Sequence, residues 1–237
     1  MTTDTILSAA DAVFAAERAV SRARWVVEEI QETIGSALRV LDDAELDSAK
    51  AKLSERGSFY LDAAGEHLGR LHTRCNDMPG LTRELFGHLD HASESVTDAR
   101  TLLDLADTSD PVIASEVAQL NPRIAVVGEM VALAKPVAQL AAQHVETAHQ
   151  ASRDVTAMGL LEAVSLGRSM ATAGLELGRA DEDVRLLGNV VDHAAASARE
   201  SAGIASEITD NARRRMAEQS RAPVLSPSLA GPGSPGR

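Results

Sequence analysis

Apolar residues recur at heptad spacing along the N-terminal part of the chain. Ile6 and Ala9 each begin a row that repeats every seven residues, and the two rows lie three residues apart. This a/d pattern is typical of helices that pack side by side, and it predicts one long amphipathic helix over residues 3–41. The first row is Ile6, Val13, Val20, Val27, Ile34 and Leu41, and the second is Ala9, Ala16, Ala23, Ile30, Ala37 and Ala44. Four more apolar residues on one flank are Ala12, Ala19, Val26 and Val40. The widened stripe favours a bundle of several helices over a two-stranded coiled coil.

Capping and turn signals divide the remainder of the first half. The sequence DDAE at residues 42–45 has an acidic N-cap with a glutamate three residues later, which is typical of a helix start. We therefore expect a break near residue 42 and a second helix over about 43–75. No glycine or proline enforces this break, so one long bent helix is the alternative. The sequence NDMPG at residues 76–80 predicts a turn, followed by a third helix over about 81–107.

The second half contains a strong boundary and a weak one. In DTSDP, residues 107–111, Ser109 or Asp110 is a suitable N-cap and Pro111 suits a first helical turn. The helical pattern weakens at Met158 and Gly159. Residues 220–237 are rich in proline, glycine and serine, which predicts a disordered tail. The expected helices of this half cover about 110–120, 122–157, 160–179 and 182–218.

These elements predict an all-α fold, an elongated multi-helix bundle with coiled-coil-like heptad packing. We expect about six helices in two segments, 1–107 and 108–219, followed by the tail at 220–237. The composition agrees with this prediction, because 44% of the residues are hydrophobic and only 2% are aromatic. Glycines also lie inside segments that are predicted to be helical. Gly174 and Gly178 have the spacing that permits two helices to approach closely.

Charge and cysteine content narrow the classes of function. The net charge of −12 argues against a general nucleic-acid binder, which needs a basic face. Cys75 is the only cysteine, so no intramolecular disulfide can form, and we expect a cytoplasmic protein. The N-terminus lacks the basic start and apolar run of a signal peptide. The most apolar stretch, residues 124–142, contains Glu129 and Lys135, so we expect a bundle helix there and no membrane span.

Three groups of side chains raise the question of a metal or catalytic site. One is the set Glu84, His88, His91 and Glu94, which shares a helical face but lies off the apolar stripe. A solvated polar face explains this set better than a metal centre. Glu146 and His149 form a single Glu-x-x-His motif, whereas di-iron bundles need two. Cys75 follows His72 by three residues, and a packed structural cysteine is the commoner outcome. We therefore predict no catalytic residue, metal or cofactor.

The single tryptophan lies on the unexpected side of the first helix. Phe14, Arg18, Ser21 and Trp25 line the back of this helix, opposite the heptad rows. Two interpretations follow. Either the first helix is central and buried on both sides, or its back face binds a partner or a second copy of the chain. Aromatic residues flanked by arginine are typical of interface anchors, so Phe14, Arg18 and Trp25 are the candidate interaction residues.

The function that we expect is a non-catalytic helical scaffold or adaptor that acts through helix–helix contacts, with self-association as one form. The tail could serve as a docking peptide. One alternative is export by a type VII-like route that needs no signal peptide. The small helical substrates of that route are similar in composition, but Val26 and Val27 follow Trp25 where those proteins have Trp-x-Gly. Their Tyr-x-x-x-Asp/Glu signal is also missing, since Ala64 lies four residues after Tyr60. A metal- or ligand-binding bundle is the further alternative.

Overall fold

Four long helices make up the described part of the chain. The computed structural model describes residues 2–106, 108–158 and 163–221, and no strand occurs in these ranges. The helices are α1 (Thr2–Leu53), α2 (Gly57–Asp104), α3 (Pro111–Met158) and α4 (Ala163–Arg221). The all-α class is as the sequence predicts, but four helices replace the expected six.

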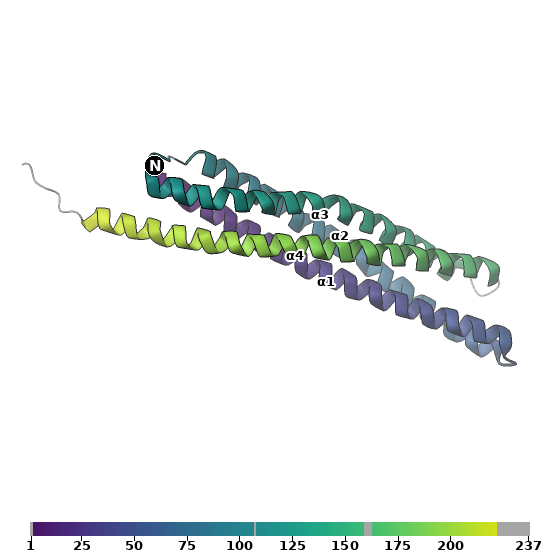
Figure 1. The fold of residues 1–237 in the computed structure, drawn as a ribbon. Coiled ribbons are helices and arrows are strands. Elements are labelled where there is room, and N and C mark those ends of the chain that lie inside the picture. The colour runs from purple at the N-terminus through teal and green to yellow at the C-terminus, as the bar shows by residue number, and fades with distance from the viewer. Residues whose placement is uncertain (1, 107, 159–162, 222–237) are drawn as a thin grey trace, which may run out of the picture.

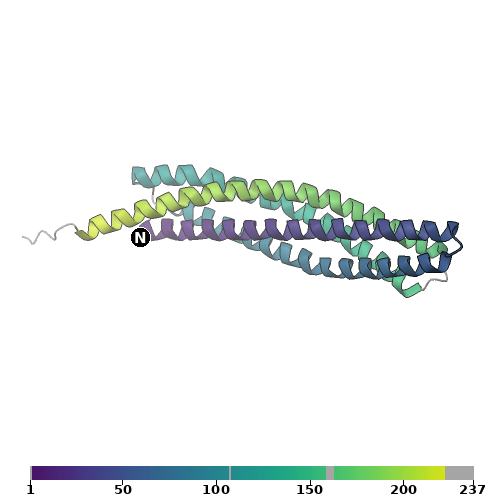
Figure 2. The same ribbon diagram turned by 90° about the horizontal axis from the view of Figure 1, so that it is seen from below.

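The helices run up and down as an elongated bundle (Figures 1 and 2). α1 packs against α2 and α4, and α3 packs against the same two helices. Neighbours are antiparallel: α4 approaches α1 at Leu41 with Gly174, and farther along the bundle Asp192 of α4 pairs with Arg24 of α1. A helix of 52 residues such as α1 is about 78 Å long at 1.5 Å per residue. This length gives each helix an extended outer face.

One continuous hydrophobic core runs between the helices. All twelve residues of the two N-terminal heptad rows are buried in it, from Ile6 to Ala44. α2, α3 and α4 contribute to the same cluster, so residues 1–107 and 108–219 share one core. No residue between 45 and 63 is buried, and the α1–α2 turn therefore lies beyond the core. In Figure 1 this turn separates from the neighbouring ends of α3 and α4.

The break expected near residue 42 is absent. α1 continues to Leu53, because Ala44 extends the alanine row into the core and is fully buried. Asp42 and Asp43 are exposed on the solvent side of the helix and cap nothing. The chain turns after Leu53 instead. A Cβ atom at Gly57 would lie 2.9 Å from the carbonyl oxygen of Ala51, so the turn requires a glycine at this position.

The prediction of a turn at residues 76–80 is also wrong, because α2 is continuous through these residues with Pro79 in its interior. Cys75, Met78, Thr82 and Leu85 are all buried, so the apolar stripe keeps its spacing across the proline. Burial of this stripe outweighs the backbone hydrogen bond that Pro79 cannot donate.

Two further expected breaks, at residues 120–122 and 179–182, lie inside helices. α3 runs through Pro122, with Leu120 and Ile124 buried on either side. α4 runs through residues 180–183, where Ala180 and Val184 are buried. In both places the core row continues past a local capping signal.

The boundary expected at residues 107–111 does separate α2 from α3. The carboxylate Oδ1 of Asp110 accepts a hydrogen bond of 2.8 Å from the backbone N–H of Val112 at the start of α3. The expected weakening at Gly159 falls on residues 159–162, outside the described residues. The predicted tail does too, apart from residues 220 and 221, which belong to α4.

Candidate interaction surfaces

The back face of α1 is only partly covered by the rest of the bundle. Phe14 is half-buried and packs against the core, whereas Arg18 is exposed. Trp25 is 59% exposed, so its indole ring faces solvent. The interpretation that α1 is buried on both sides is therefore wrong at Trp25. Phe14, Arg18 and Trp25 lie along one helix, but only Arg18 and Trp25 are exposed to an approaching protein.

Trp25 lies beside a surface groove of about 400 Å³ between α1 and α2. Ser21 and Arg22 of α1 line the groove with it, and Glu84 and His88 of α2 form the opposite side. His88 Nε2 lies 3.6 Å from Glu84 Oε1 within α2. An aromatic ring surrounded by polar side chains has the composition of an interface anchor with a polar rim.

The outer face of α3 is unusually poor in charge. Of the 19 exposed residues between 111 and 153, four are charged: Arg123, Glu129, Glu146 and Arg153. On α1, between residues 4 and 53, 12 of the 17 exposed residues are charged. Three exposed apolar residues of α3, Val126, Leu133 and Leu140, are spaced seven residues apart and share one side of the helix. The sequence predicts a bundle helix over residues 124–142 but does not single out this exposed row. The available signal was that apolar residues occupy both faces of the stretch, more than one core face can bury.

α3 also contains the most apolar window of the described chain. An 18-residue window within Pro111–Arg153 has a mean hydropathy of 1.5, and a third of it is buried in the bundle. By length and composition alone, this helix is able to cross a membrane. Core helices of water-soluble proteins pass the same test, and Ile124, Val127 and Val131 of α3 are fully packed in the core.

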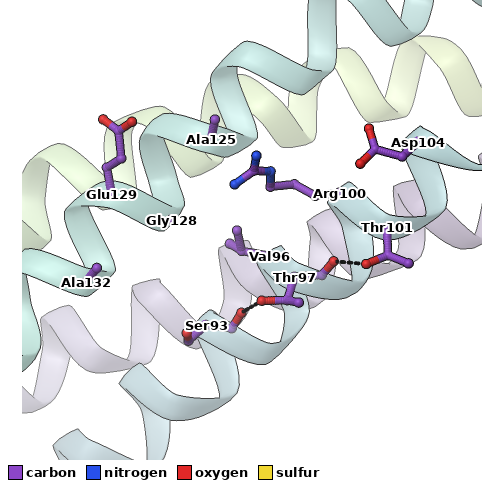
Figure 3. Close-up of a pocket in the computed structure, with 10 residues that line it drawn as sticks. All are labelled: Ser93, Val96, Thr97, Arg100, Thr101, Asp104, Ala125, Gly128, Glu129 and Ala132. Carbon is purple, nitrogen blue, oxygen red and sulfur yellow. Dashed lines mark hydrogen bonds between the residues drawn. The ribbon is translucent and has the colours of Figure 1, made fainter.

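A second groove, of about 490 Å³, runs between α2 and α3 next to this outer face (Figure 3). Val96, Thr97 and Arg100 line it from α2, and Ala125 and Ala132 from α3. Thr97 and Thr101 donate their hydroxyl protons to backbone carbonyls one turn earlier in α2, at 2.8 and 2.9 Å. These hydroxyl groups therefore bond within their own helix, and the charged side chains that line the groove are Arg100, Asp104 and Glu129.

A polar cluster lies between α2 and α3. The rings of His72 and His149 stack with centroids 5.5 Å apart. Ser152 lies 3.3 Å from Nδ1 of His72 and donates to the carbonyl oxygen of His149 at 2.7 Å. Burial raises the pKa of the Cys75 thiol to about 11, against the smaller lowering effect of its hydrogen bond with Ser152. Cys75 is thus a protonated, packed thiol at neutral pH and a poor nucleophile.

The other side chains weighed as metal ligands from the sequence do not form a site. Glu84, His91 and Glu94 are exposed, and only His88 of that set is half-buried. Glu146 is exposed on α3, whereas the ring of His149 is half-buried and stacks on His72. Within the described ranges, no group of three or more histidine, cysteine, aspartate or glutamate side chains is placed to hold a metal ion.

Two buried carboxylates join α3 to α4. Glu176 Oε2 lies 2.6 Å from Nδ1 of His144, and its Oε1 accepts a hydrogen bond of 2.8 Å from Arg179. The hydrogen bond from His144, aided by the charge of Arg179, lowers the pKa of Glu176 against the opposing effect of burial. Toward the other end of the bundle, Glu116 accepts hydrogen bonds from Asn211 and Arg215 of α4. Both carboxylates are satisfied inside the protein, as buried charges must be.

Comparison of this chain with protein-family models, with curated proteins and with solved structures finds no match. The features that bear on function are therefore the chain's own: a solvent-facing tryptophan on α1, a face of α3 with few charges, and the buried carboxylates Glu176 and Glu116, which bond to side chains inside the protein.

Proposed function

We propose that this protein is a non-catalytic helical scaffold or adaptor that binds another protein through the back face of α1. The observation that carries the proposal is Trp25, 59% exposed beside the α1–α2 groove. Burying an indole ring at an interface removes a large apolar surface from water, and tryptophan is among the residues that dominate binding energy. The backbone of Trp25 is already fixed in a helix, so only its side-chain freedom is lost on binding.

The chemistry of this face suggests the kind of partner. Arg18 and Arg22 are exposed on the same side of α1 as Trp25. An amphipathic helix with an apolar residue for the groove and acidic residues on its rim would complement this surface. The non-catalytic part of the proposal is supported by Cys75, which is a protonated thiol at neutral pH, and by Glu176 and Glu116, whose carboxylates are held by interior partners.

Site-specific photocrosslinking tests the proposal. A benzophenone amino acid replaces Arg22, which lines the Trp25 groove, and the full-length protein is irradiated in its native cells. We expect a discrete crosslinked product that disappears when Trp25→Ala is added. The matched control carries the benzophenone at Leu186, which is also exposed but lies on α4. Equal crosslinking from both positions, or a product that persists with Trp25→Ala, would count against a binding site at Trp25.

A further inference from the structure

The outer face of α3 forms an apolar strip between residues 118 and 143. Val126, Leu133 and Leu140 are 41%, 54% and 49% exposed, and they follow one another at heptad spacing. Ala118, Pro122, Ala132 and Pro136 are exposed on the same helix and carry no charge. Bundle helices ordinarily place polar residues on their outward face. A strip of this length with so few exposed charges therefore marks a surface that another element covers.

We propose that a second copy of this chain covers this strip, with the two α3 helices packed antiparallel about a twofold axis at Leu133. This contact lies on a different helix from Trp25, so it stands independently of the partner proposed for α1. In the twofold arrangement Leu133 meets Leu133 of the second copy, and Val126 meets Leu140 of the second copy. A twofold interface must be self-complementary in this way, and the row Val126, Leu133 and Leu140 is symmetric about its centre.

Electrostatic repulsion between two acidic chains favours association through α3. Each chain has a net charge of −12, so most approaches of two copies are opposed by like charge. The strip between residues 118 and 143 has only two exposed charges, Arg123 and Glu129. Arg123 already pairs with Glu200 of α4. α3 is thus the surface on which two copies meet with the least repulsion.

The position of Glu129 distinguishes the two possible orientations. In a parallel pairing in register, the two Glu129 carboxylates would oppose each other directly. In the antiparallel pairing about Leu133 they are eight residues apart along the axis, or about 12 Å at 1.5 Å per residue. That separation exceeds the screening length of about 8 Å at physiological salt. The antiparallel orientation therefore avoids the main unfavourable contact.

The size of the strip sets the strength of the contact. Its 26 residues correspond to about 39 Å, and a helix is about 10 Å wide. The resulting footprint of about 400 Å² is half of the roughly 800 Å² per partner of a standard stable interface. We therefore expect a reversible dimer that forms in the micromolar range.

Sedimentation equilibrium of the full-length protein, from about 1 to 500 µM, tests the dimer. We expect wild type to pass from monomer to dimer over this range. Leu133→Glu places two carboxylates at the twofold axis and should weaken association at least tenfold. Leu186→Glu alters a similarly exposed leucine of α4 and should change it less than twofold. Circular dichroism of both variants verifies that they are folded. Equal weakening by both substitutions would overturn the assignment of the interface to α3.

Disulfide trapping tests the orientation. Val126→Cys and Leu140→Cys proteins are mixed and oxidised, and we expect the mixed disulfide to dominate. Cys75 does not interfere, because it is fully buried and its pKa is about 11. A predominance of the two homodisulfides would show parallel pairing and overturn the proposal.

The alternative to a second copy is a lipid membrane that covers the same strip, and the same variants distinguish the two. Wild-type protein that stays monomeric at 500 µM overturns the dimer. If that monomer co-sediments with vesicles of phosphatidylcholine and phosphatidylglycerol, and Leu133→Glu abolishes this binding while Leu186→Glu does not, the strip binds membrane instead.

Discussion

Buried charges hold the α3–α4 seam at the scale of single residues. Glu176 and Glu116 are each nearly inaccessible, yet each bonds to an arginine, Arg179 and Arg215 respectively. His144 bridges two carboxylates, since its Nε2 also lies 3.6 Å from Asp183. A buried pair of this kind adds less to stability than its geometry suggests, because both partners lose hydration. Removing one partner is costly, however, since the other is then left unpaired.

Glu176 should make the stability of the bundle depend on acid. Its pKa lies below the ordinary value for glutamate, so the native state favours the carboxylate. The stabilisation is present at neutral pH and is lost as the pH falls below about 4.3 and through the lowered native value. Glu176→Gln should therefore lower stability at pH 7 by about 1 kcal/mol, or about 2–4 °C in Tm.

Thermal unfolding of wild type, Glu176→Gln and Glu182→Gln between pH 3 and 7 provides the measurement. Glu182 is an exposed residue of the same helix and serves as the control. The difference between wild type and Glu176→Gln should shrink toward pH 3. A difference that stays constant across this range would show that ionisation of Glu176 is not its source.

At the scale of helices, the apolar heptad rows predicted the extent of the helices better than the capping and turn signals did. Both rows of α1 are buried throughout, and the boundary at residues 107–111 separates two helices. The breaks expected at residues 42, 76–80 and 120–122 do not occur, because apolar rows continue through them into one core. Capping and turn signals act locally, whereas burial of a row over many turns is a tertiary effect that outweighs them.

The exposure of the candidate surfaces could not be predicted either, because it also depends on tertiary packing. The sequence placed Trp25 on the back of α1 but left open whether another helix covers it, since that depends on helix order in space. It missed the outer face of α3 because a stretch that is apolar on both sides resembles a buried helix. Only the positions of α2 and α4 show that Val126, Leu133 and Leu140 remain outside.

Pro79 provides a direct test of the continuity of α2. In an unbroken helix, Pro79→Ala restores a backbone donor and relieves a steric clash, so we expect it to raise stability by about 1–3 kcal/mol. Pro111→Ala is the matched control, because Pro111 is the first residue of α3 and its missing N–H costs nothing there. Urea unfolding of the three proteins gives the free energies. Unchanged or lower stability of Pro79→Ala would mean that the backbone at residue 79 needs a proline.

At the scale of the whole molecule, the two helical hairpins depend on each other. α1 and α2 pack together, as do α3 and α4, but α1 also contacts α4 and α2 contacts α3. Gly174 carries one of these cross-contacts: a Cβ atom there would lie only 3.0 Å from Cδ2 of Leu41, whereas at Gly178 it would meet nothing within 4 Å. The ion pair between Lys135 and Asp90 carries another, at 2.9 Å.

This dependence predicts that neither half of the chain is a domain. Separate polypeptides of residues 1–107 and 108–221 would each expose the apolar rows that the other half covers in the single core. A lone pair of antiparallel helices buries too little apolar area to offset its conformational entropy. We expect each half alone to unfold without a cooperative thermal transition in circular dichroism at 222 nm. An equimolar mixture should recover a 1:1 complex with a cooperative transition. A cooperative transition in either isolated half, with light scattering showing a monomer, would instead establish two domains, and the shared core would then serve only as their interface.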